Sequence, residues 1–123
     1  MSTDTHQRAC AWAADAVGAE EVGRGATYHL RGRDGRRIRV AGRHIESRQP
    51  NYFHAGQSLE GDPFDNLVVV LFRSDWTVEY AYRLPLDAVR HHHKQPGRQA
   101  CRLMIRGGDS WRLDRDRGVE ALT

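Results

Sequence analysis

The sequence predicts a single domain of mixed α/β class, an α+β arrangement in which an N-terminal helix packs on a central mixed β-sheet and a short helix follows towards the C-terminus. Three observations support this prediction. The chain has 123 residues, 39% of them hydrophobic and 28% charged, which is the size and composition of one globular domain. Helical and strand periodicities both occur along it. No internal repeat or long linker divides residues 1–123.

Residues 3–17 have the apolar spacing of an amphipathic helix. Apolar side chains recur three and four positions apart and form one stripe: Ala9, Trp12, Ala13, Ala16 and Val17. Thr3 or Asp4 is a suitable N-cap, and Gly18 is a suitable stop. We therefore expect a helix whose apolar stripe faces the sheet.

The next predicted elements are two strands joined by a tight turn. Residues 28–31 form the first strand, residues 33–36 with their Asp-Gly pair form the turn, and residues 37–43 form the second strand. The pleat of the second strand separates an apolar row from a basic row. The apolar row is Ile38, Val40 and Gly42, and the basic face carries Arg37, Arg39, Ala41 and Arg43.

Residues 44–63 are polar and rich in turn-forming residues, so we expect a long surface loop. Within it, Tyr52, Phe53 and His54 have two interpretations. They stack on a nucleic-acid base, or they fasten the loop to the core. We favour the second interpretation.

The second half of the chain predicts two further strands, a short helix and a last strand. Residues 66–72 are apolar from Leu67 onwards, as in a buried central strand, and residues 76–84 alternate as in a half-covered antiparallel strand. The shared face of that strand is Trp76, Val78, Tyr80, Tyr82 and Leu84. Pro85 opens a helix that ends near His93. Residues 101–106 form the last strand, and residues 114–122 a closing helical turn.

The positive charge of the chain is concentrated in residues 24–48. The chain has 18 arginines and one lysine, Lys94, and its net charge is +3. Residues 24–48 hold eight arginines against two acidic residues, which is what a phosphate-binding surface looks like. A solvated or salt-bridged strand face is the alternative. The candidate nucleic-acid-binding residues are Arg31, Arg33, Arg36, Arg37, Arg39, Arg43, His44 and Arg48.

The order of elements and several short strings carry a resemblance to a known superfamily. The strings are Tyr28-x-Leu30, Ile38 to Arg43, Phe64 to Leu71 and Ala81 to Pro85. Over about residues 5–95, the chain resembles small proteins of the restriction-endonuclease-like, PD-(D/E)XK, superfamily. The resemblance implies that fold for the whole domain, residues 1–123.

The resemblance also implies a degenerate active site. In active members, the strand before the hairpin supplies an aspartate, and the strand after it supplies an acidic residue and, two positions on, a lysine. These positions fall near His29, on Arg39 and on Ala41. Mg²⁺ prefers carboxylate oxygens, and Arg39 would repel it. The resemblance therefore implies the fold and argues against metal-dependent cleavage.

Three functional hypotheses follow. The first is a non-catalytic domain that binds nucleic acid, DNA rather than RNA, through the basic hairpin and strand face, without a cofactor. The second is a Mg²⁺-dependent nuclease with relocated catalytic residues, for which the candidates are His29, Asp34, Glu46 and Asp65. The third is an accessory subunit or homodimer that uses the Trp76, Tyr80 and Tyr82 face.

Histidines and cysteines give weaker signals. His91, His92 and His93 point about 100° apart on a helix, so we expect no metal site there. For His29 and His44 two hypotheses stay open: that they form a two-histidine metal site, or that one of them is a general base. The two cysteines, Cys10 and Cys101, are expected to be buried thiols rather than a disulfide. The sequence shows no membrane helix or signal peptide, so we expect a cytoplasmic protein with no membrane partner.

Overall fold

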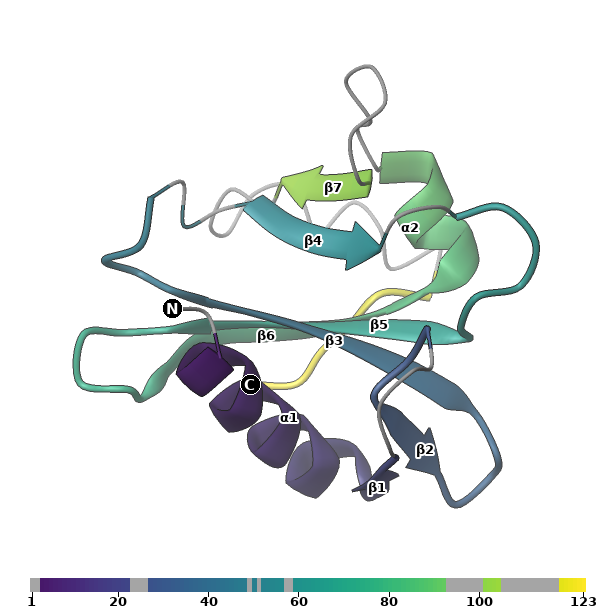
Figure 1. Cartoon of the computed structure of the whole chain (residues 1–123), viewed down its shortest axis with the longest axis horizontal. Helices are drawn as coiled ribbons and strands as arrows, with labels where there is room; N and C mark the ends of the chain where they lie inside the picture. Colours follow the sequence, from purple (N-terminus) through teal and green to yellow (C-terminus); the bar gives the residue numbers. More distant parts are fainter. Residues whose placement is uncertain are drawn as a thin grey trace.

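A six-stranded mixed sheet lies between a long helix on one face and a two-stranded sheet with a short helix on the other (Figure 1). The computed structural model describes residues 3–22, 27–48, 50, 52–56, 59–92, 101–104 and 118–123. This arrangement confirms the predicted mixed α/β class. In chain order the elements are α1 (Thr3–Val17), β1 (Ala19–Glu21), β2 (Leu30–Gly32), β3 (Arg37–His44), β4 (Tyr52–Gly56), β5 (Asn66–Phe72), β6 (Val78–Pro85), α2 (Leu86–His92), β7 (Cys101–Met104) and β8 (Glu120–Ala121).

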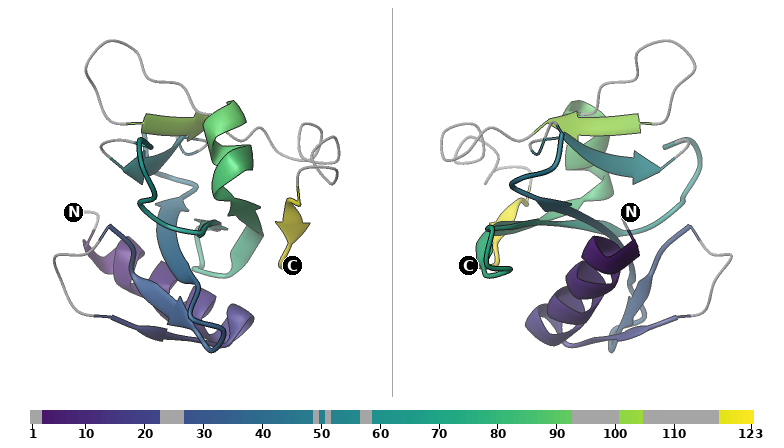
Figure 2. Two further views of the ribbon diagram at one scale, coloured as in Figure 1. Left: turned by 90° about the vertical axis from the view of Figure 1, so that its right-hand side faces the viewer. Right: turned by 60° about the vertical axis from the view of Figure 1, so that its left-hand side comes forward.

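The large sheet has the strand order β1-β2-β3-β5-β6-β8, and its two-stranded companion pairs β4 with β7 (Figure 2). Strands β3 and β5 are parallel, whereas the other neighbours are antiparallel. Every residue of β5 is buried, which explains its continuous apolar sequence. Val68 and Val70 pack on the α1 side of the sheet, and Leu67 and Val69 pack on the side of β4, β7 and α2.

The contact between α1 and β3 confirms the apolar row of β3 and four of the five residues of the predicted helix stripe, whereas Ala16 is exposed. Ile38 and Val40 are buried in the same cluster as Ala9 and Ala13 of α1. Gly42 allows the two elements to approach closely, because a Cβ at this position would lie 2.5 Å from the Ala9 Cβ atom. Such a distance is far inside van der Waals contact, so glycine is required here.

Strand β4 lies inside residues 44–63, which we predicted to be a loop. Phe53 and Ala55 are fully buried, and His54 between them is exposed, which is the alternation of a half-buried strand. Phe53 therefore fastens this segment to the core, as the favoured interpretation of the aromatic cluster holds. It is not available to stack on a base.

The predicted aromatic face of residues 76–84 is wrong, because the register of β6 shifts at a bulge. The pairing moves from Leu71–Tyr80 to Phe72–Val78, so one residue of β6 is skipped. Trp76 lies in the preceding turn with a φ of 67° and packs with Val78 on the α1 side. Tyr80 packs on the opposite side with Tyr82 and Leu84. Trp76 and the two tyrosines therefore do not form one surface.

Three smaller differences concern the ends of elements. Strand β1 was not predicted, and Pro85 ends β6 instead of opening α2. Residues 120 and 121 form β8, which pairs with β6 where we predicted a helical turn. Residues 114–117, residues 105 and 106, and His93 lie outside the described part of the chain. No helix within the described residues is long and apolar enough to cross a membrane.

Candidate functional site

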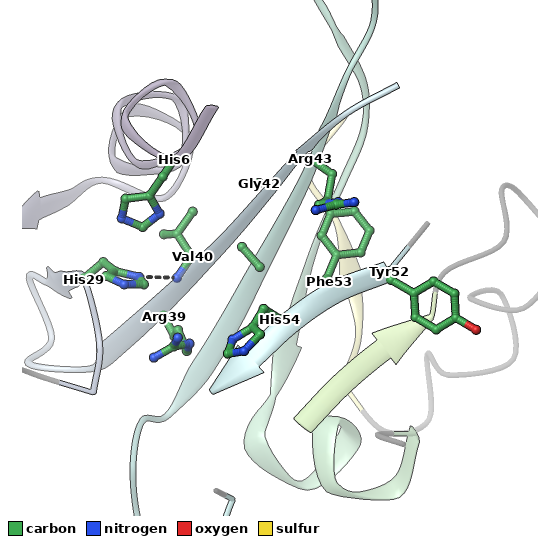
Figure 3. A pocket seen from close by; sticks show the side chains of 10 residues that line it. His6, His29, Arg39, Val40, Gly42, Arg43, Tyr52, Phe53 and His54 are labelled. Carbon is green, nitrogen blue, oxygen red and sulfur yellow. Dashed lines mark hydrogen bonds between the residues drawn. The ribbon is translucent and has the colours of Figure 1, made fainter. Parts of the chain in front are cut away.

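A polar pocket of about 430 Å³ opens beside β3, between α1 and β4 (Figure 3). Four segments that are distant in the sequence meet here: α1, the residue preceding β2, β3 and β4. Among the described residues that line it, none is an aspartate or a glutamate. The lining residues are His6, His29, Arg39, Val40, Ala41, Gly42, Arg43, Tyr52, Phe53 and His54.

Arg39 places a partly buried positive charge at this pocket. Its Nη1 donates a hydrogen bond to the Thr27 carbonyl at 3.0 Å, and its Nε is buried without a hydrogen-bond partner among the described residues. Burial lowers the pKa of the guanidinium below its usual range. The backbone of β4 passes close to it, since a Cβ at Gly56 would lie 3.6 Å from the Arg39 Cζ atom. Within the described parts of the chain, Arg39 forms no ion pair with a carboxylate.

His29 is held in one orientation at the wall of the pocket. The Val40 N–H donates to its Nδ1 at 2.9 Å, so the neutral ring carries its proton on Nε2. Burial, and then the nearby His6 and Arg39, lower the pKa of His29 to about 4. At neutral pH the ring is therefore uncharged, and its Nε2–H is a hydrogen-bond donor. The ring also meets His6 edge-on, with centroids 4.5 Å apart (Figure 3).

Cys10 lies behind the two histidines. Its Sγ is 3.4 Å from His6 Nε2, and it is a free, buried cysteine as predicted. Burial, with a smaller contribution from Glu21, raises the pKa of the thiol to about 11. In the ion-free protein the thiol is therefore protonated at neutral pH. The side chain of Cys101 lies outside what the structure describes.

Sequence reasoning missed His6 and Cys10 as members of this site, and it considered His54 only as a residue that stacks on a base or fastens the loop to the core. The signal for the first two was present, because positions i and i+4 of a predicted helix lie on the same face. His54 carried no such signal, since it reaches the pocket only through β4, which was not predicted.

The predicted basic row of β3 is divided by its contacts. Arg37 is bound by Asp62 at 2.9 Å and by Asp65 at 3.4 Å, and Asp65 also accepts the Arg37 backbone N–H at 2.7 Å. These hydrogen bonds and the arginine charge hold the pKa of Asp65 below its usual range. Arg43 lines the pocket and donates to the Arg48 carbonyl. Within this basic row, Arg37 is therefore salt-bridged, which was the alternative interpretation, whereas Arg39 and Arg43 line the pocket.

The remaining candidate arginines lie elsewhere. Arg31 donates to the Tyr28 hydroxyl, and Arg36 forms an ion pair with Asp34 at 3.2 Å in the β2–β3 turn. Arg33 and Arg48 are exposed. These four side chains do not line the pocket, so the structure does not gather the candidate residues into one footprint.

His44 does not join His29. It packs on Trp76, with ring centroids 4.4 Å apart. Its Nδ1 accepts the Glu46 backbone N–H at 3.2 Å. The structure therefore does not bring the two histidines together as a metal site.

The relocated carboxylates proposed for a nuclease do not line the pocket either. Asp65 is engaged by Arg37, and Asp34 by Arg36. Glu46 accepts a hydrogen bond from the Ser74 hydroxyl at 3.2 Å. Asp34 and Asp65 both line a separate pocket at the β2–β3 turn, and among the residues described none of the three acidic groups lines the pocket that holds His29.

The three positions to which the superfamily resemblance assigns the active site do meet. His29, Arg39 and Ala41 all line the pocket. Their side chains differ chemically from the aspartate, acidic residue and lysine that active members have at these positions. Similarity to known proteins adds no identification: no protein-family model matches the chain, and no curated protein is significantly similar to it.

Proposed function

We propose that this chain is a non-catalytic nucleic-acid-binding domain, related to the restriction-endonuclease-like proteins, that takes a backbone phosphate at the pocket around Arg39. The observation that carries the proposal is the Arg39 guanidinium. It is partly buried, its Nε has no described hydrogen-bond partner, and no described carboxylate lines the pocket. A charge in this setting is costly unless an anion approaches it.

The neighbouring groups suit a phosphate better than a carboxylate substrate or a cation. His29 presents an Nε2–H donor, and Arg43 and His54 line the same pocket. A phosphate offers several acceptor oxygens to such donors, and arginine binds it in a bidentate manner. We propose DNA before RNA because of the superfamily resemblance. The proposed absence of cleavage rests on the same resemblance, because this chain lacks the carboxylates that active members use.

The proposal predicts that Arg39→Gln abolishes most of the nucleic-acid binding. We would measure fluorescence anisotropy of a labelled DNA duplex and of a single-stranded RNA at low salt, and repeat it at rising salt. Loss of one phosphate contact with a partly buried arginine should weaken binding by about tenfold or more. It should also make the slope of log binding constant against log salt concentration shallower by about one.

Arg73→Gln is the matched control, because it removes one positive charge from an exposed arginine that is paired with Glu79 away from the pocket. It should change the affinity much less than Arg39→Gln. Equal effects of the two variants would assign binding to net charge alone. Absence of binding at low salt, or tighter binding as salt rises, contradicts the proposal, as does Mg²⁺- or Mn²⁺-dependent cleavage of the duplex that is lost in His29→Gln.

A further inference from the structure

We propose that His6, Cys10 and His29 form a binding site for a thiophilic divalent ion, with Zn²⁺ as the best match. The imidazole and thiol ligand atoms of these residues all lie within 4.8 Å of one another. This inference does not rest on the nucleic-acid proposal, and in the ion-loaded protein His29 would hold the ion instead of donating its Nε2–H to a phosphate.

The helix supplies two ligands in a suitable position. His6 and Cys10 are four residues apart on α1, so both side chains leave the same face. Zinc bonds of about 2.3 Å to sulfur and about 2.0 Å to nitrogen place two tetrahedral ligands about 3.5 Å apart. The Cys10 Sγ and His6 Nε2 atoms are 3.4 Å apart. The pair can therefore chelate one ion with almost no movement.

His29 is the third ligand, and it must change its hydrogen bonding to bind. Its Nδ1 accepts the Val40 N–H, so its Nε2 carries a proton in the ion-free protein. An ion binds only a deprotonated ring nitrogen. Binding therefore turns the ring away from Val40, and the broken hydrogen bond is a specific mark of the third ligand.

The ligand types select the metal. One thiolate and two imidazoles suit Zn²⁺, whereas Mg²⁺ and Ca²⁺ need oxygen ligands that this cluster does not contain. The thiolate also offsets part of the ion's charge beside Arg39. Because His6 and His29 line the pocket, the fourth coordination position faces it and is open to water or to an anion.

The test is a Co²⁺ and Zn²⁺ titration of the full chain in which His91, His92 and His93 are replaced by asparagine, so that histidines outside the cluster do not contribute to the measured stoichiometry. We expect one ion per chain, with a thiolate-to-cobalt charge-transfer band that Zn²⁺ removes by competition. His6→Gln and Cys10→Ser should each weaken binding by tenfold or more. The chain with the three asparagines is the parent for these variants. Its Val40 amide resonance in a ¹⁵N spectrum should shift on Zn²⁺ loading.

His54→Ala is the matched control, because His54 lines the same pocket outside the cluster. It should bind the ion as the parent does. Circular dichroism checks that each variant is folded; if Cys10→Ser is not, the charge-transfer band of the parent and the His6→Gln result decide. No stoichiometric band, or equal affinity in His6→Gln and the parent, overturns the site. An unchanged Val40 amide overturns the role of His29.

Discussion

At the scale of single residues, the partners of the arginines decide which of them are available to a ligand. Arg37 and Arg39 are two positions apart on the same face of β3, and the sequence gives no reason to separate them. Arg37 is bound by Asp62 and Asp65, which lie more than 20 residues further along the chain. Arg39 has no such carboxylate among the residues described. Charge clustering in residues 24–48 therefore includes the arginines of the candidate pocket but does not distinguish Arg39 from Arg37, because pairing depends on the tertiary structure.

Asp65 gives a pH-dependent prediction at this scale. Its pKa in the folded chain is lowered, mainly by the backbone N–H and side chain of Arg37, with Arg36 also nearby. The contribution of Asp65 to stability is therefore present above its unfolded pKa of about 3.9 and is lost as the pH falls through the lower folded value. We expect Asp65→Asn to be less stable than the wild type at pH 7, with a difference that shrinks towards pH 2.

Urea denaturation at a series of pH values measures this difference. Asp87→Asn is a suitable control, because the Asp87 side chain is 95% exposed and its only described partner, Arg90, is 3.8 Å away. The interpretation fails if the gap between Asp65→Asn and the wild type stays constant or widens in acid.

At the scale of elements, long periodic segments were predicted well and short or irregular ones were not. Helix α1 has the predicted boundaries of residues 3–17, and β5 the predicted boundaries of residues 66–72. Both have a periodic or continuous apolar signal over many residues. Strand β4 has only five residues and its partner β7 is distant in the chain, so local pattern did not reveal it. The bulge in β6 was equally invisible, because alternation alone assumes an uninterrupted pleat.

Strand β4 also provides a test of the layer that closes the pocket. Phe53 is fully buried against the large sheet, and His54, the next residue, is exposed and lines the pocket. Phe53→Ala should lower the free energy of unfolding by about 3–5 kcal/mol, as expected for a buried phenylalanine. His54→Ala should change it by less than about 0.5 kcal/mol. Chemical denaturation measures both variants, and similar effects of the two would show that β4 does not pack as described.

At the scale of the whole molecule, the sequence predicted the class of fold, and the candidate pocket lies among residues that it singled out. The α1, hairpin and β5–β6 order was sufficient for a mixed α/β domain, and the superfamily resemblance placed three active-site positions that all line one pocket. The predicted open basic footprint is replaced by a partly covered pocket, because β4 lies over the basic face of β3. The covering strand does not follow from local sequence, since its pairing with β7 depends on a contact between distant segments.

A nuclear magnetic resonance titration of the ¹⁵N-labelled chain with a short DNA duplex tests binding at the pocket most directly. The proposal predicts that the Arg39 side-chain Nε–H and the backbone amides of Val40 to Arg43 shift in a saturable manner. The amides of the β2–β3 turn, residues 33–36, should shift much less. Shifts centred on the turn with an unchanged Arg39 Nε–H would contradict the proposal, and so would a spectrum that the duplex leaves unchanged at low salt.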